Sequence, residues 1–461
     1  MLTFLGFLTI GVILALLLTN RVAAVVALAG VPVVTALVAG NTPAEIGTYV
    51  SEGLAGVVGV TAMFVFAIAY FGVVRDAGMF DPIIRRIVAF AGDAPVTVCL
   101  ATTTLAMAAH LDGAGATTFL ITIPAMMPLF DRLGMKRLTL TVCVGMGAGV
   151  MNLLPWGGPT ARASTTSGVG VNELWVPLIP AQVAGMLGAL AIAYFLGRRE
   201  TKRLAETADD RSLSTVGGPD AASGGTGAAA PSGDDAPSGP GHELTEEEAA
   251  LRRPRLFWFN IALTALTIAG LVTTLAPPEL LFLVALVVAL VVNYPGLKEQ
   301  TARIQAHAEG AMLMASTLLA AGAFLGILDG SGMVTAMATS TAEVVPASWA
   351  PGLPLLVGVL GVPLSLLFGP DAYYFGVLPV LQGLGAEFGV ANADLARASL
   401  VGQETVGFPI SPLTGSFFLL VGLAGVDIGR HIRALFGWVW LLSLVMLVVA
   451  VATGAVPLWA S

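Results

Sequence analysis

Long apolar runs separated by short polar segments make up most of the sequence. Of the 461 residues, 56% are hydrophobic and 11% are charged. Because about 20 apolar residues in a helix cross the hydrocarbon core of a bilayer, we predict an all-α polytopic membrane protein. The apolar runs, two of them interrupted at the centre, cover residues 2–19, 22–38, 58–74, 95–130, 138–167, 178–197, 256–276, 280–292, 311–328, 351–387, 395–423 and 434–458.

Two of these runs contain residues that break helices. Residues 138–161 carry no charge, yet they include Pro155 and Pro159 around a Gly-Gly pair, and they lead directly into Arg162. A helix that opens its hydrogen-bond ladder at membrane depth is tolerated only inside the protein or beside a water-filled cavity. The run at 395–423 is interrupted in a similar way by two prolines. We therefore predict two broken helices that line a site, as in secondary transporters.

The two broken runs occupy corresponding places in an internal repeat. Three landmarks of the first half recur at a nearly constant distance later in the chain. The matching pairs are Gly72 and Gly326, Pro124 and Pro379, and Gly145 and Gly402. We assign residues 1–197 to the first repeat and 254–461 to the second. Residues 198–253 between them are rich in Gly, Ser, Pro, Asp and Glu, which predicts a disordered linker.

The basic residues predict how the chain is oriented. We place five transmembrane helices in each half, together with re-entrant hairpins at 95–130 and 351–387. With the N-terminus outside, 19 of the 21 Lys and Arg residues, Arg75 among them, then lie on one side, and the exceptions are Arg162 and Arg397. The positive-inside rule makes that side, and with it the linker, cytoplasmic. An odd number of crossings inverts the halves relative to each other. Full crossings in place of the hairpins give the same sidedness.

Each predicted hairpin carries an acidic residue at its tip. The first tip contains His110, Asp112, Thr117 and Thr118 around glycines, and the second contains Asp371. Ionisable groups within a membrane segment are candidates for function, because burying them unpaired costs several kcal/mol. A structural interpretation is also open, since the acids can cap helices and His110 can be a satisfied hydrogen-bond partner.

Two further charged residues lie in the broken helices. Arg162 cannot lose its proton, so at membrane depth it requires an anion, carbonyls or water, and we expect it to bind a carboxylate of the substrate. Glu404 either takes part in coupling or pairs with another helix. The sequence contains no Walker loop, dinucleotide fingerprint, HExxH motif or GxSxG motif in a strand–helix setting. We therefore predict a transporter driven by an ion gradient, with no enzymatic activity, no nucleic-acid partner and no permanently bound cofactor.

The sequence resembles the CitMHS family of bacterial symporters across both halves. Long motifs carry the resemblance: YFGVVRDAGMFDP, HLDGAGATTFLITIPAMMPL, MNLLPWGGPTARA, GPDAYYFGVLPVL and GFPISPLTGSF. The resemblance implies a plasma-membrane protein that imports citrate complexed with a divalent metal ion, coupled to protons. The alternative is an ion-coupled carrier of another di- or tricarboxylate that requires no metal. The repeat supplies two gates and so disfavours a passive channel.

More distantly, the sequence is similar to the ion-transporter superfamily of dicarboxylate carriers, which implies an elevator mechanism and a homodimer. Pro409 and Pro412 match the second broken helix of that superfamily. Where the first tip of the family often reads DGDG, this chain has Ala114, a difference that bears on metal preference or coupling. The matched motifs and the polar residues beside the breaks give the expected substrate-binding residues: Thr117, Thr118, Asn152, Gly157, Gly158, Pro159, Thr160, Arg162, Ser411 and Thr414.

The charge of citrate favours transport of a neutralised complex. Citrate carries nearly three negative charges at neutral pH, and one divalent cation reduces this to about one, which a single guanidinium can balance. Hard oxygen ligands suit Mg²⁺ or Ca²⁺, and a citrate complex of a transition metal also fits. Metal or proton coupling is assigned to His110, Asp112, Asp371 and Glu404, because desolvation favours the protonated form of a carboxyl group. The identity of the metal and the proton stoichiometry are left open.

Overall fold

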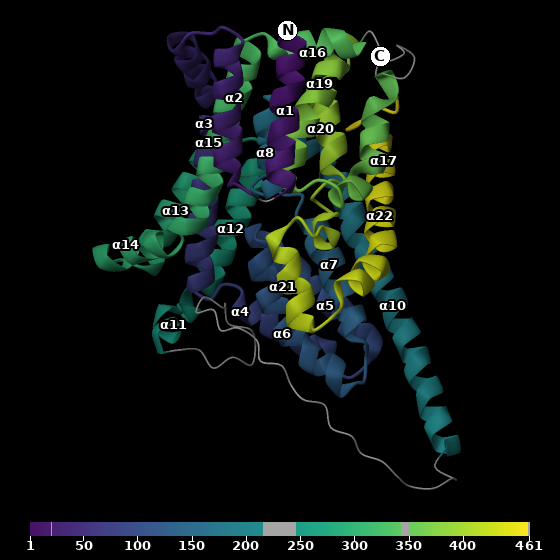
Figure 1. Cartoon of the computed structure of the whole chain (residues 1–461). Coiled ribbons are helices and arrows are strands. Elements are labelled where there is room, and N and C mark those ends of the chain that lie inside the picture. Colours follow the sequence, from purple (N-terminus) through teal and green to yellow (C-terminus); the bar gives the residue numbers. More distant parts are fainter. Residues whose placement is uncertain (20, 215–245, 343–349, 460–461) are drawn as a thin grey trace.

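The computed structural model describes residues 1–19, 21–214, 246–342 and 350–459. Within these residues the chain is helical and contains no β-strand (Figure 1). In the described part, five helices are long and apolar enough to cross a membrane: Pro43–Asp76, Val171–Thr207, Pro254–Val272, Ala308–Gly330 and Ile428–Ala452. Shorter apolar helices accompany them. The predicted all-α polytopic membrane fold is therefore confirmed.

The first half contains the first predicted hairpin and the first broken helix. Its α-helices are α1 (Leu2–Leu18), α2 (Ala24–Val38), α3 (Pro43–Asp76), α4 (Asp81–Ala91), α5 (Pro95–Ala109), α6 (Gly115–Arg132), α7 (Arg137–Met151), α8 (Gly158–Ser167), α9 (Val171–Trp175) and α10 (Ile179–Ser214). The short turn η1 (His110–Asp112) joins α5 to α6 and forms the hairpin tip. Helices α7 and α8 are the two limbs of the broken helix, as predicted.

The second half repeats this order. Its α-helices are α11 (Glu246–Leu251), α12 (Phe257–Val272), α13 (Pro278–Asn293), α14 (Leu297–Ala306), α15 (Ala308–Gly330), α16 (Met333–Ala342), α17 (Leu353–Ser365), α18 (Pro370–Ala372), α19 (Leu378–Glu387), α20 (Asn392–Leu400), α21 (Gly415–Ala424) and α22 (Ile428–Ala452). Helices α17 to α19 form the second hairpin, and α20 and α21 are the limbs of the second broken helix. In Figure 1, α5 and α6 lie in the lower part of the molecule and α17 and α19 in the upper part.

Several helices differ from the apolar runs. Helix α3 begins well before the predicted start at 58, because Thr42 and Glu45 form a capping box around Pro43. Helix α4 carries Arg85 and Arg86 and is strongly amphipathic, so a search for apolar runs overlooks it. The same search missed α14 and α16.

Corresponding helices of the two halves pack closely against each other. Helices α3 and α15 lie side by side (Figure 1). A Cβ atom on Gly53 would lie 2.1 Å from the carbonyl oxygen of Gly322, and one on Gly326 would lie 2.2 Å from that of Tyr49. Only glycine permits this approach of the two backbones. The α3–α15 pair is therefore a rigid contact between the halves.

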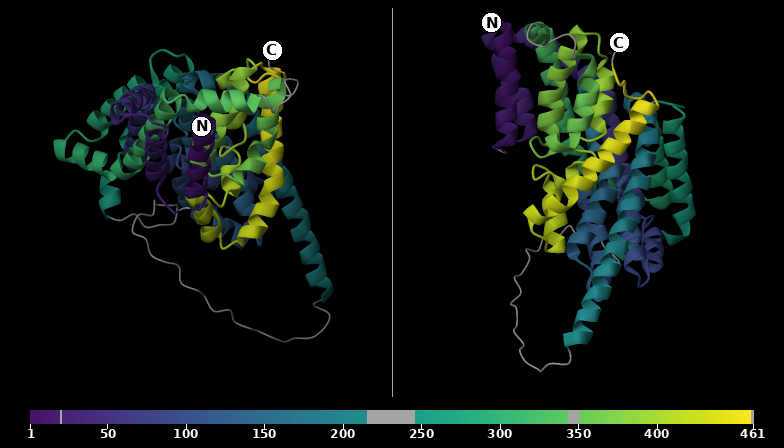
Figure 2. Two further views of the ribbon diagram at one scale, coloured as in Figure 1. Left: turned by 45° about the horizontal axis from the view of Figure 1, so that its top comes forward. Right: turned by 90° about the vertical axis from the view of Figure 1, so that its right-hand side faces the viewer.

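The predicted linker is shorter than its composition suggested. Helix α10 continues through residues 198–214, and its end projects beyond the bundle (Figures 1 and 2). This part has good helix-forming residues and ion pairs one turn apart, such as Arg203 with Glu200. At the other end, the main-chain amide of Arg253 donates to the Ala77 carbonyl at 2.9 Å. Residues 198–214 and 246–253 are thus structured, while 215–245 lie outside the described residues.

Candidate substrate-binding site

The first broken helix opens at the position that its prolines predict. Helix α7 ends at Met151, and α8 begins at Gly158 with Pro159 in its first turn, where the missing amide is harmless. Gly157 precedes α8 in a tight turn, since a Cβ atom there would lie 2.6 Å from the Asn152 carbonyl oxygen. The break is therefore fixed by local sequence.

The second broken helix contains a buried acid in an unusual backbone conformation. After α20 ends at Leu400, the chain turns through 401–407 and a short 3-10 segment, and α21 begins at Gly415. Glu404 lies in this turn with a φ of +53° and is 1% exposed. A non-glycine residue in the left-handed region is strained by about 1–3 kcal/mol and commonly marks a functional site.

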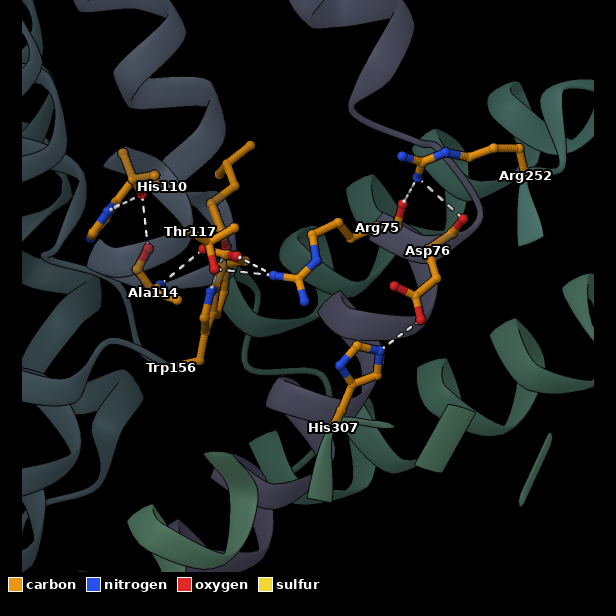
Figure 3. Close-up of polar contacts among 11 residues, drawn as sticks. Arg75, Asp76, His110, Ala114, Thr117, Trp156, Arg252 and His307 are labelled. Atoms are coloured by element: carbon orange, nitrogen blue, oxygen red, sulfur yellow. Dashed lines mark hydrogen bonds and ion pairs between the residues drawn. The ribbon is translucent and has the colours of Figure 1, made fainter. Parts of the chain in front are cut away.

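The first hairpin tip holds Asp112 by two different kinds of contact. One carboxylate oxygen, Oδ1, accepts a hydrogen bond from the Ala114 amide at 2.9 Å and so stabilises the turn. The other, Oδ2, lies 3.3 Å from Nη1 of Arg75 on α3, which also donates to the Thr117 hydroxyl at 3.1 Å (Figure 3). The Asp112 side chain is only 6% exposed. Asp112 therefore stabilises the turn before α6 but does not cap that helix as we had considered, and it also has an ionic partner.

Arg75, which we counted with the residues of the cytoplasmic side, contacts the first hairpin tip. It lies in the last turn of α3, and its guanidinium points to the tip rather than into solvent (Figure 3). Its neighbour Asp76 points in another direction, where it accepts from Arg303 Nη1 at 2.9 Å and lies 2.8 Å from His307 Nε2. Arg252 caps the same helix end by donating to the Arg75 carbonyl at 2.7 Å. Sequence reasoning did not name Arg75 as a site residue, although it lies in one of the long motifs, YFGVVRDAGMFDP.

A chain of hydrogen bonds joins the first tip to both breaks. His110 Nδ1 lies 2.7 Å from the Thr118 hydroxyl, and Nε2 lies 3.2 Å from Asn152 Oδ1. The Asn152 amide in turn donates to the Glu404 carbonyl at 2.7 Å. Trp156 Nε1 donates to the carbonyl of Leu111 at 2.8 Å. His110 is thus a buried residue with both ring nitrogens paired, in agreement with its structural interpretation.

The second hairpin tip pairs with the first broken helix. Arg162 Nε donates to Asp371 Oδ1 at 2.6 Å, and Arg162 Nη1 donates to the Gly158 carbonyl at 3.1 Å. The side chains of Arg162 and Asp371 are 11% and 26% exposed. Each tip acid therefore faces one arginine from another element, Asp112 facing Arg75 and Asp371 facing Arg162.

Glu404 differs from the tip acids because no arginine in the described part of the chain forms an ion pair with it, although Arg162 is near enough to interact with it electrostatically. Its Oε2 accepts from the Thr414 hydroxyl at 2.9 Å, and its amide donates to the Ser365 hydroxyl at 2.9 Å. The other oxygen, Oε1, and the Ser411 hydroxyl are buried beside each other, and among the described residues neither has a hydrogen-bond partner in good geometry. The hydroxyl of Thr160 is also buried without a partner. Buried polar atoms left unpaired in this way are unusual and suit a ligand or a proton.

The structure therefore connects the predicted residues in two groups. One group is the first tip with its hydrogen bonds to both breaks, and the other is the pair of Arg162 and Asp371. Gly157, Gly158 and Pro159 shape the start of α8, and Thr117 and Thr118 lie in the first turn of α6. The roles of all these residues in binding stay predictions.

Known transporters match the chain along nearly its whole length. Residues 5–402 match the family CitMHS, described as citrate transporter. A citrate transporter of Bacillus subtilis (strain 168) is 41% identical over 456 residues, covering 99% of this chain and 100% of that protein. A Mg(2+)/citrate complex secondary transporter of the same bacterium is 37% identical over 458 residues, with the same coverage.

Two solved transporter structures share the fold. The YdaH transporter of Alcanivorax borkumensis has a TM-score of 0.54 at 15% sequence identity, over 89% of this chain and 88% of that one. MtrF of Neisseria gonorrhoeae has a TM-score of 0.54 at 15% identity, over 89% and 83%. The family and the matched relatives are plasma-membrane transporters and not enzymes. Because the family match and the relatives cover most of this polytopic helical chain, it belongs to the CitMHS family of citrate transporters.

Proposed function

We propose that this transporter imports citrate as a complex with a divalent cation, coupled to protons. The observation that carries the proposal is the ion pair between Arg162 and Asp371, which joins a broken helix to a hairpin tip at 2.6 Å. When the two side chains separate, the site presents one fixed cation, Arg162, and one fixed anion, Asp371, to a ligand. The ligand that satisfies both must itself carry both signs.

A metal–citrate complex meets this requirement better than free citrate does. A carboxylate of the complex binds Arg162, and the cation takes Asp371 as an additional oxygen ligand. Free citrate satisfies Arg162 but brings further carboxylates against Asp371, and like charges at this range repel. The 37% identical relative is named for transport of a Mg(2+)/citrate complex, which supports the same substrate class here. Mg²⁺ or Ca²⁺ suits such oxygen ligands.

Glu404 is the residue that we propose to carry the proton. Both tip acids form an ion pair with an arginine, whereas Glu404 forms no ion pair among the described residues and has one buried oxygen without a hydrogen bond of good geometry. A buried carboxyl group without a cation is readily protonated, and its proton can occupy the unpaired oxygen. His110 is the weaker candidate, because both of its ring nitrogens are already paired.

The proposed movement is of the elevator type between inverted repeats. The two hairpins lie in opposite parts of the molecule in Figure 1, which supports inversion. Helix α5 has 15 residues and is about 22 Å long, short of a bilayer core of about 30 Å, which supports a re-entrant hairpin. We propose that the hairpins and broken helices move against the rigid α3–α15 pair, within a homodimer.

Uptake of labelled citrate into proteoliposomes tests the proposal. With an imposed pH gradient, we expect uptake to rise when Mg²⁺, Ca²⁺ or another divalent ion is added and to fall when a chelator is added. The series of metals identifies the preferred complex. Uptake that is inhibited by metal and retained with chelator would contradict the proposal and indicate a carrier of the free acid.

A further inference from the structure

A cavity lies on the predicted cytoplasmic side, away from the candidate site. It has a volume of about 700 Å³ and lies between the start of α7, the middle of α10 and the start of α22. Helices α10 and α22 pack side by side along this part (Figure 2). The apolar part of α10 ends here at Leu196, and basic residues follow. The cavity is therefore at the level of the lipid headgroups.

The rim of the cavity holds more cations than the protein neutralises. Glu200 accepts from Arg203 and from Thr139, and Lys202 lies 3.8 Å from Glu206. These contacts account for two of the basic residues. The others are Lys136, Arg199 and Arg433, all exposed, and no acidic side chain among the described residues lies within ion-pair distance of them. Lys136 at the N-cap of α7, Arg199 on α10 and Arg433 on α22 thus surround one opening, and no carboxylate among the described residues pairs with any of the three.

The floor of the cavity is apolar. Leu138, Val142, Leu196 and the ring of Trp438 line it. The Trp438 ring lies against Phe195, with 5.9 Å between the ring centroids. Tryptophan at this level is typical of the boundary between headgroups and acyl chains. A basic rim above an apolar floor matches a molecule with a negative head and a hydrocarbon body.

We propose that this cavity binds an anionic phospholipid of the cytoplasmic leaflet. The phosphate is held by Lys136, Arg199 and Arg433, and the first part of an acyl chain covers the apolar floor. Basic pockets between transmembrane helices on the cytoplasmic side are typical sites for anionic headgroups. A free anion such as phosphate or citrate would meet the cations but leave the floor exposed, so the floor favours a lipid.

The test is lipid retention by the full-length protein. After purification from membranes containing phosphatidylglycerol, native mass spectrometry in mild detergent should show one bound phosphatidylglycerol in the unaltered protein. The variant R199Q/R433Q should bind it about thirtyfold more weakly, because each cation near an anionic lipid contributes about fivefold. The variant R85Q/R86Q is the matched control, since it removes two cations from α4 on the same side. It should retain the lipid.

A second variant separates a lipid from a free anion. L138W fills the apolar floor and leaves all three cations in place, so it should also lose the lipid. Equal retention by the unaltered protein, R199Q/R433Q and L138W would overturn the proposal. So would stabilisation against heat by inorganic phosphate equal to that by phosphatidylglycerol added in phosphatidylcholine vesicles. If R199Q/R433Q does not fold, L138W and this vesicle comparison decide the question.

Discussion

Replacing Asp371 by asparagine is expected to change which form of citrate the transporter accepts. Asparagine has the same shape and keeps a carbonyl oxygen for Arg162 Nε, so the hairpin tip should hold its position. It removes the negative charge that, in our proposal, binds the cation of the complex and repels free citrate. Transport of the metal complex should weaken, and transport of free citrate should improve.

The expected size follows from the geometry of the pair. Arg162 Nε and Asp371 Oδ1 are 2.6 Å apart, but the side chains are 11% and 26% exposed, so solvent screens part of the attraction. A hydrogen bond to a charged group contributes about 1.5–3 kcal/mol and a neutral one about 1 kcal/mol, a difference of about 0.5–2 kcal/mol. At about 1.4 kcal/mol per factor of ten, this is about 2- to 30-fold in apparent affinity.

The assay is citrate uptake into proteoliposomes at saturating Mg²⁺ and with chelator. In D371N the ratio of the two KM values should shift toward free citrate by at least about fourfold, because weaker binding of the complex and weaker repulsion of free citrate both change it. D394N is the control, since Asp394 and Arg397 form a pair at 3.7 Å with 23% and 19% exposure, outside the candidate site. If D371N keeps the metal requirement and the KM of the unaltered protein, the assignment of Asp371 to the cation is wrong.

Three other predictions test separate parts of the structure. E404Q should abolish citrate accumulation driven by a pH gradient but retain exchange of citrate across the membrane, and the control E387Q should retain both. If the uptake by E404Q depends on pH as it does in the unaltered protein, Glu404 is not the proton carrier. R75Q should reduce uptake about tenfold when the protein is present in the membrane at its normal amount, since a hydrogen bond to a charged group contributes about 1.5–3 kcal/mol. R85Q should not reduce uptake. Equal uptake by the two variants would show that the contact of Arg75 with the hairpin tip is dispensable. G326A should lower the free energy of unfolding by about 1–3 kcal/mol or more, because the added methyl group overpacks against Tyr49. G56A should not, because the space beside Gly56 on α3 is open. Similar melting curves for the two variants would contradict the close packing of α3 and α15.

The sequence by itself determined the features that arise locally. Apolar runs predicted the membrane helices, and the prolines and glycines around 152–157 predicted the first break, because a missing amide or a tight turn acts where it stands. The long motifs identified the family and named Arg162 and Asp371 as separate candidates. Composition also predicted the linker, but it placed the boundary too early, since it measures apolar content and not the helix propensity that extends α10 to Ser214.

Only the tertiary structure decided which charges meet. Arg75 and Asp112 are 37 positions apart, and Arg162 and Asp371 are 209 apart, so each pair depends on how whole helices pack. The sequence placed Arg75 only on the cytoplasmic side, because the positive-inside rule gives the side of the membrane and not the partner of a side chain. The same packing left Glu404 without an arginine and grouped three unpaired cations around one cavity. An ion pair needs two side chains within a few ångströms, and in a helical membrane protein that distance is set by the fold and not by spacing along the chain.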